Sequence, residues 1–158
     1  MRRSLRPWCA AIALALAATG AAFAKEGAEE EAAALDPSYA AAKTAITERR
    51  YADAVRLLDD ALSRNANDAD THNLLGYAHR KGGNLERAFH HYDQALRLNP
   101  QHRGAHEYIG EAYLMANNPA KAEDHLAQLK RYCSRVCQER DDLEKAITDY
   151  RRRTAAAK

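Results

Sequence analysis

The residues of this chain repeat at a spacing of 34 positions, and this spacing limits the folds that the chain can adopt. Gly76 maps onto Gly110, and His72 maps onto His106. Three further registers hold Ala54, Ala88 and Ala122; Leu58, Tyr92 and Leu126; and Ala61, Ala95 and Leu129. Self-similarity at a fixed period of about 20 to 50 residues is typical of repeat architectures. We therefore expect three structural copies, over 35–68, 69–102 and 103–136.

Each copy has the pattern of two antiparallel helices. In the middle copy, apolar residues recur at steps of three and four along 74–78 and again along 85–96, as on one face of an α-helix. Gly76 and Gly110 lack a side chain, so two helices can approach closely there. Asp36-Pro37 and Asn118-Pro119 each read as a helix N-cap followed by proline at the first helical position. No segment alternates at period two, so the pattern predicts no sheet.

A last amphipathic helix is expected after the third copy. In the segment "QERDDLEKAITDYRRR", Leu143, Ala146, Ile147 and Tyr150 lie at i, i+3, i+4 and i+7, with charges on the other faces. One hairpin cannot bury such apolar faces alone, so neighbouring copies must stack and a terminal helix must cover the end. We predict an all-α solenoid of three helical hairpins and a capping helix over 137–153, with seven helices and a frayed tail at 154–158.

The middle copy closely resembles the tetratricopeptide repeat (TPR). The residues that carry the resemblance are Leu75-Gly76, Ala88, Tyr92, Ala95 and Pro100. The third copy keeps Ile109-Gly110, Tyr113 and Ala122, but has Leu126, Leu129 and Ser134 in place of an aromatic residue, an alanine and a proline. The first copy is looser, with Ala41-Ala42 for Leu-Gly and Ala66 for the proline. The resemblance implies a fold of stacked hairpins whose first helices line a concave face.

Family members commonly bind a peptide or partner protein on that face, so the resemblance implies a non-catalytic protein-protein interaction module. Its groove positions correspond here to Tyr39, Lys43, Asn73, Tyr77, Arg80, Lys81, Glu107, Glu111, Leu114 and Met115. The family's clamp for a C-terminal carboxylate is not reproduced, because Glu107 and Glu111 carry negative charge. We expect aromatic anchors in a groove that is basic toward the middle and acidic toward the C-terminal end. An equally weighted alternative is that Tyr39 and Tyr77 only pack between hairpins.

The first 24 residues read as a cleaved export signal. They combine Arg2, Arg3 and Arg6 with an apolar run over 8–18 and the cleavage pattern Ala22-Phe23-Ala24. Cleavage would leave an acidic, flexible leader over 25–34 and would lower the net charge from +2 to about −1. We therefore expect a periplasmic protein that does not bind nucleic acid and has no stable membrane insertion. Retention of the segment as an anchor is the alternative.

Enzyme signatures are mostly missing from the sequence. There is no G-x-S-x-G, no phosphate-binding glycine loop and no C-x-x-C-H motif. "HEYIG" begins like a zinc-protease helix, but Gly110 stands where the second histidine would be. The densest histidine group is His90, His91, His102 and His106. Adjacent histidines on a helix point about 100° apart, so we favour surface or groove residues over a metal site and predict no cofactor.

Cys133 and Cys137 are the two cysteines that remain after signal cleavage, and they flank the predicted turn before the capping helix. An oxidising compartment favours a structural disulfide. The alternatives are a redox-active pair, since Arg131, Arg135 and Arg140 would favour thiolate, and a copper site with a third ligand such as His125. His125 points about 80° away from Cys133 on one helix. The alternative function is accordingly a thiol-redox or copper-handling accessory factor.

Overall fold

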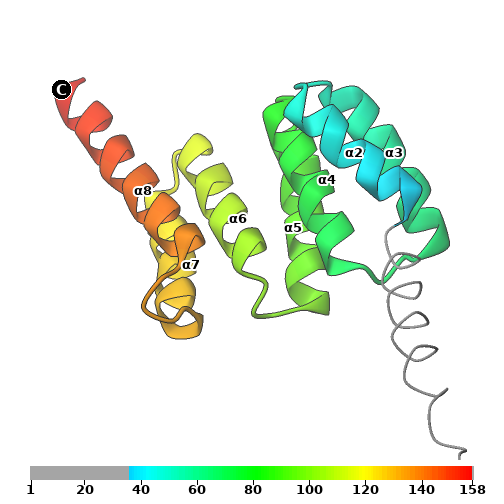
Figure 1. Cartoon of the computed structure of the whole chain (residues 1–158). Helices are drawn as coiled ribbons and strands as arrows, with labels where there is room; N and C mark the ends of the chain where they lie inside the picture. Colours follow the sequence, from blue (N-terminus) through cyan, green and yellow to red (C-terminus); the bar gives the residue numbers. More distant parts are fainter. Residues whose placement is uncertain (1–35, 158) are drawn as a thin grey trace, which may run out of the picture. The chain divides into compact units, whose positions relative to one another are not determined.

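A computed structural model describes residues 36–157 of the chain (Figure 1). These residues form seven α-helices and no strand, as predicted. The predicted signal at 1–24 and the leader at 25–34 lie outside the described residues. The helices are α2 (Pro37–Thr47), α3 (Tyr51–Arg64), α4 (Ala69–Lys81), α5 (Leu85–Leu98), α6 (Arg103–Met115), α7 (Pro119–Tyr132) and α8 (Gln138–Ala156).

Successive helices pair as hairpins, and the hairpins stack. Helices α2 and α3, α4 and α5, and α6 and α7 contact each other within the three predicted copies, while α3 packs on α4 and α5 on α6 between copies. Helix α4 also contacts α6, and α6 contacts α8, so the first helices of successive copies are neighbours. Figure 1 shows this order from α2 to α8. The structure confirms the predicted all-α solenoid of helical hairpins.

The turn inside each hairpin has the same conformation in all three copies. Arg49, Gly83 and Asn117, which are 34 positions apart, have positive φ values of 59°, 87° and 58°. The residue after each one donates its N–H to the carbonyl of the residue five positions before it, at 2.8 Å in every copy. This is the left-handed helix ending that glycine adopts most readily. The 34-residue period is therefore kept by the backbone even where the side chains differ.

Helix starts follow the polar residues that precede them. Asp36 and Asn118 cap α2 and α7 with their side chains, and Pro37 and Pro119 occupy the first turn, which confirms both predicted N-caps. His102 is also an N-cap, since its Nδ1 accepts the Ala105 N–H at 3.1 Å. These side chains satisfy N–H groups that have no partner inside the helix.

The core is built on the three registers found in the sequence. All nine of these residues are buried: Ala54, Ala88 and Ala122; Leu58, Tyr92 and Leu126; and Ala61, Ala95 and Leu129. A methyl group at Gly76 would lie 2.4 Å from the Tyr92 ring, which confirms a close approach of α4 and α5. At Gly110 the partner differs from the expectation. Its close neighbour is Leu143 of α8, at 2.7 Å from an added methyl, because α8 stacks on α6 as the next first helix would.

Helix α8 covers the end of the third hairpin. Its Leu143 and Ile147 are buried against Leu126 and Leu129, and the Tyr150 hydroxyl donates to the Asn117 side chain in the α6–α7 turn. The predicted bounds of 137–153 need correction, because the helix runs from Gln138 to Ala156. Thr154–Ala156 are helical rather than frayed, since alanine has the highest helix propensity and no proline or glycine interrupts the segment. No described helix has the length and apolar character needed to cross a membrane.

Candidate partner-binding face

Helices α4 and α6 bring most of the predicted groove residues to one surface. We define the α4–α6 face by Asn73, Tyr77, Arg80 and Lys81 of α4 with Glu107, Tyr108 and Glu111 of α6. These residues of α4 lie on one side of the helix, because Tyr77 follows Asn73 by four positions, and Arg80 and Lys81 follow Tyr77 by three and four. The two helices pack against each other, and side chains from both meet on this face.

Aromatic rings join the two helices on the α4–α6 face. The Tyr77 and Tyr108 rings lie 5.0 Å apart between centroids, so Tyr77 packs onto the following repeat. The Arg80 guanidinium lies 5.4 Å from the Tyr77 ring and 5.6 Å from the Tyr108 ring. Lys81 Nζ lies 5.4 Å from the Tyr77 ring, and such cation–π contacts hold cations on aromatic faces. Sequence reasoning missed Tyr108, because it shares the apolar register of Leu74.

Arg80 is buried, with 5% of its surface exposed. Its Nη1 forms an ion pair with Glu111 at 2.6 Å, and its Nε donates to the Tyr92 hydroxyl at 3.3 Å. Its Nη2 and the Asn73 Oδ1 are buried without a hydrogen-bond partner. The expected basic middle of the groove is therefore reduced to Lys81, because Glu111 neutralises the charge of Arg80.

Glu107 lies in an acidic environment beside this ion pair. Burial, together with the nearby carboxylates of Glu111, Asp142 and Glu139, raises the pKa of Glu107 to about 8, while the charge of Arg80 acts in the opposite direction. In the described part of the chain, no lysine or arginine forms an ion pair with Glu107. The acidic character expected toward the C-terminal end thus centres on this residue.

The remaining predicted groove residues are not all on this face. Leu114 is a correction: it is only 8% exposed and packs with Ala122 and Leu126 in the core, so it cannot line a groove. Met115 is exposed at the end of α6. Tyr39 packs against the core cluster of Leu58 and Leu75, which agrees with its alternative role between hairpins. Lys43 is exposed and lies 5.9 Å from the Tyr39 ring.

Two histidine pairs recur at the 34-residue spacing. His72 Nδ1 lies 3.2 Å from His91 Nδ1, and His106 Nδ1 lies 2.9 Å from His125 Nδ1. In each pair, Nε2 of the first histidine also contacts a backbone carbonyl, at Ala66 (3.3 Å) or Pro100 (3.0 Å). The group of four histidines singled out in the sequence is not brought together. The signal that could have found the pairs is their equal separation of 19 positions in both copies.

The carbonyl contacts define the protonation pattern of each pair. A carbonyl only accepts, so Nε2 of His72 and of His106 carries the hydrogen, and the neutral ring then accepts at Nδ1. His91 and His125 therefore donate from Nδ1. Burial and the neighbouring histidines lower the pKa of both His91 and His125 to about 4. Each pair consequently holds two neutral imidazoles at neutral pH.

Cys133 and Cys137 form a disulfide across the turn between α7 and α8, with their Cα atoms 5.7 Å apart. Cys133 is the C-cap of α7 and Cys137 the N-cap of α8, as the repeat register predicts. Arg140 donates to the Ser134 and Arg135 carbonyls and holds the short loop between the cysteines. Among residues 36–157, no group of three histidine, cysteine or carboxylate side chains is placed to hold a metal ion.

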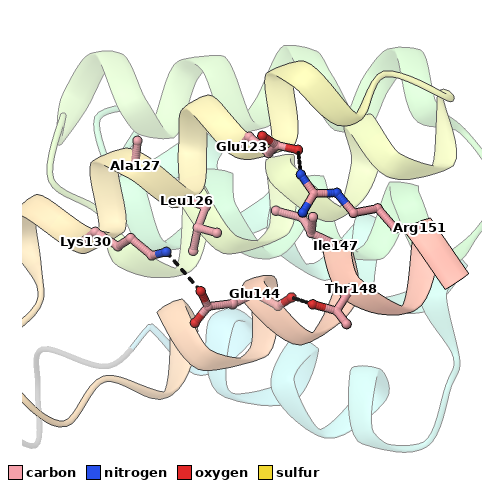
Figure 2. Close-up of a pocket in the computed structure, with 8 residues that line it drawn as sticks. All are labelled: Glu123, Leu126, Ala127, Lys130, Glu144, Ile147, Thr148 and Arg151. Carbon is pink, nitrogen blue, oxygen red and sulfur yellow. Dashed lines mark hydrogen bonds and ion pairs between the residues drawn. The ribbon is translucent and has the colours of Figure 1, made fainter.

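A cleft of about 280 Å³ lies between α7 and α8 (Figure 2). Leu126 and Ile147 form its apolar floor, and the ion pair between Lys130 and Glu144 spans it at 2.9 Å. The second ion pair across it joins Glu123 and Arg151. Because its charged groups are paired with each other, this cleft has no unsatisfied charge for a ligand.

Comparison with known proteins supports the architecture. The tetratricopeptide repeat family model matches residues 69–102. No curated protein sequence matches the chain at a significant level. Residues 69–102 are thus a tetratricopeptide repeat, and the helices on both sides continue the same architecture. The chain therefore contains one segment that matches the tetratricopeptide repeat family, within an all-α solenoid of stacked hairpins.

Several solved structures have this fold. MamA from Desulfovibrio magneticus RS-1 is 21% identical with a TM-score of 0.58, over 60% of this chain and 54% of that one, so the chain spans about half of that structure. The Yersinia enterocolitica type III secretion chaperone SycD, in complex with a peptide of the translocator YopD, is 15% identical with a TM-score of 0.64, over 74% and 92% of the two chains. The Sgt2 TPR domain from Aspergillus fumigatus is 19% identical with a TM-score of 0.61, over 76% and 78%.

Proposed function

We propose that this protein is a non-catalytic, periplasmic interaction module that binds a peptide or partner protein on the α4–α6 face. The observation that carries the proposal is the meeting of Tyr77 and Tyr108 over a buried Arg80 whose Nη2 has no partner. Aromatic and arginine side chains are the usual anchors of protein interfaces. A buried donor without a partner is costly, so a ligand that supplies an acceptor gains free energy there.

The fold is consistent with this function. SycD has the same fold, and its structure holds a peptide of its translocator. Proteins built from these repeats are generally interaction modules rather than enzymes. The periplasmic location is supported by the signal-like residues 1–24 and by the disulfide between Cys133 and Cys137, which is favoured in oxidising compartments.

Site-specific photo-cross-linking in intact cells tests the binding face. A photoreactive amino acid placed at Lys81, an exposed position of the α4–α6 face, should form a covalent adduct with the partner. The matched control is Arg97, an exposed residue of α5, which is the second helix of its hairpin and does not belong to the α4–α6 face. We expect the Tyr77→Ala substitution to reduce the adduct at position 81, because the ring is half-buried and available to a ligand.

Arg80 is unsuitable for this test, since its burial and its ion pair make a truncation destabilising. An adduct that forms equally at positions 81 and 97, or that persists in the Tyr77→Ala variant, would place binding elsewhere. Location is tested separately, by fractionation and by N-terminal sequencing of the mature protein, which should begin at Lys25. A mature protein that retains residues 1–24 would contradict the cleaved signal.

A further inference from the structure

The charges on the α4–α6 face do not balance. Arg80 pairs with Glu111 at 2.6 Å, and Arg103 lies 3.6 Å from Glu139, so these cations already have carboxylate partners. Glu107 and Asp142 have no such cation in the described residues. The carboxylates of Glu111, Asp142 and Glu139 all act on Glu107. The surface around Glu107 therefore has an excess of negative charge that a ligand can neutralise.

Two buried polar atoms on α4 point to the same occupant. Asn73 is 7% exposed, and its Oδ1 is an acceptor without a donor. Its amide nitrogen lies 3.1 Å from the position of a methyl at Gly104, so the side chain reaches the first turn of α6. Glu107 lies one turn further on the same side of that helix. Arg80 Nη2 is the second atom, and it lacks an acceptor.

We propose that the α4–α6 face holds a partner segment through a lysine or arginine side chain seated at Glu107, with Asn73 Oδ1 as a second acceptor. This inference rests on the proposed function and names the chemistry of the partner. A cationic side chain has donors for both acceptors and no acceptor of its own. Arg80 Nη2 then donates to a main-chain carbonyl of the same segment. An acidic partner is disfavoured, because Lys81 is the only cation of this face without a carboxylate partner in the described residues.

The raised pKa of Glu107 gives the interaction a pH signature. With a pKa of about 8, the side chain is mostly protonated at pH 7 in the free protein, and a bound cation favours its ionised form. Affinity for a basic segment should therefore rise about 10-fold between pH 7 and pH 9, as the ionised fraction of Glu107 rises. Lysine and arginine remain charged over this range.

The experiment selects ligands without assuming a partner. A random dodecapeptide library displayed on phage is panned against the full chain at pH 8.5, and the enriched peptides are titrated by fluorescence anisotropy. We expect enrichment of lysine or arginine, and a loss of affinity of about 10-fold in Glu107→Gln, because a charge-assisted hydrogen bond is lost. The matched control Glu86→Gln, on the exposed side of α5, should bind as the unchanged protein does.

The outcomes separate this inference from the proposed function. The enriched peptides could be acidic or apolar and still bind the Tyr77→Ala variant more weakly. That result would overturn the inference of a basic partner and would support the α4–α6 face as the binding site. Basic peptides whose affinity is unchanged in Glu107→Gln, or shows no rise between pH 7 and pH 9, would also overturn it. Peptides that bind Tyr77→Ala normally, or a library that yields no binder, would overturn both.

Discussion

The histidine pairs make the stability of this protein sensitive to acid. His91 and His125 have a pKa of about 4 in the folded chain, because burial and neighbouring positive groups disfavour their charged forms. The unfolded chain binds protons near pH 6.5, so it takes up more protons than the folded chain between pH 6.5 and pH 4. Stability contributed by these groups is therefore present above pH 6.5 and is lost as pH falls toward 4.

We predict that the double variant His91→Asn and His125→Asn has a smaller fall in Tm between pH 6.5 and pH 4 than the unchanged chain. Asparagine keeps an N–H donor near the position of Nδ1 but does not titrate. Thermal melts followed by circular dichroism at pH 4, 5 and 6.5 measure the slope. The control is His90→Asn, an exposed neighbour of His91, which should keep the original slope. Equal slopes in all three proteins would contradict the assignment.

Gly76 is a second residue on which packing depends. We predict that Gly76→Ala destabilises the protein by about 1 to 3 kcal/mol, since the new methyl would meet the buried Tyr92 ring at 2.4 Å and overpack the core. Gly110→Ala is the comparison, because it meets only the flexible end of Leu143. Urea unfolding measures both changes. A Gly76→Ala variant as stable as the unchanged chain would show that Tyr92 moves aside without cost.

Among the elements, the three turns inside the hairpins share one backbone conformation but differ in the residue that adopts it. Arg49, Gly83 and Asn117 adopt the same left-handed conformation, which glycine and asparagine tolerate and arginine does not favour. We predict that Arg49→Gly stabilises the chain by about 1 kcal/mol and that Gly83→Arg destabilises it by a similar amount. Urea unfolding of each variant gives the sign, and opposite signs at the two positions are the required result.

The elements also show how far sequence could predict the structure. The hairpins and the core followed from the 34-residue registers, because buried alanine and leucine positions recur wherever helices pack in the same way. The left-handed turn at Arg49 could not be predicted from the residue itself, because arginine is not typical of that conformation. Only its position, 34 residues before Gly83, indicates the turn. Tyr77 and Glu107 are partly exposed on α4 and α6, and their role in binding stays a prediction, whereas Leu114 is buried in the core. The burial of Arg80 depends on Tyr92, Glu111 and two rings from separate helices, which no local pattern contains.

At the scale of the whole molecule, the disulfide between Cys133 and Cys137 joins the last helix to the stacked hairpins. We predict that Cys133→Ser with Cys137→Ser lowers the free energy of unfolding by about 2 kcal/mol, the loop-entropy value for a short loop. Helix α8 should lose protection first in hydrogen exchange, because it is held to α7 across this link. Reducing agent should lower the Tm of the unchanged chain and leave that of the variant as it is. Equal protection of α8 in both proteins would show that its apolar contacts suffice.

The shared geometry of the three turns also bears on how such a protein changes in length. The chain also leaves the first two hairpins alike, since the C-caps Asn65 and Asn99 have similar backbone angles, with φ values of −141° and −136°. The segment 69–102 is therefore a unit whose two ends fit copies of itself. An in-frame duplication of its coding sequence would add one complete hairpin and leave every existing junction unchanged. Duplication or deletion of this segment therefore lengthens or shortens the solenoid by one whole hairpin at a time, between the first hairpin and the disulfide-linked helix α8.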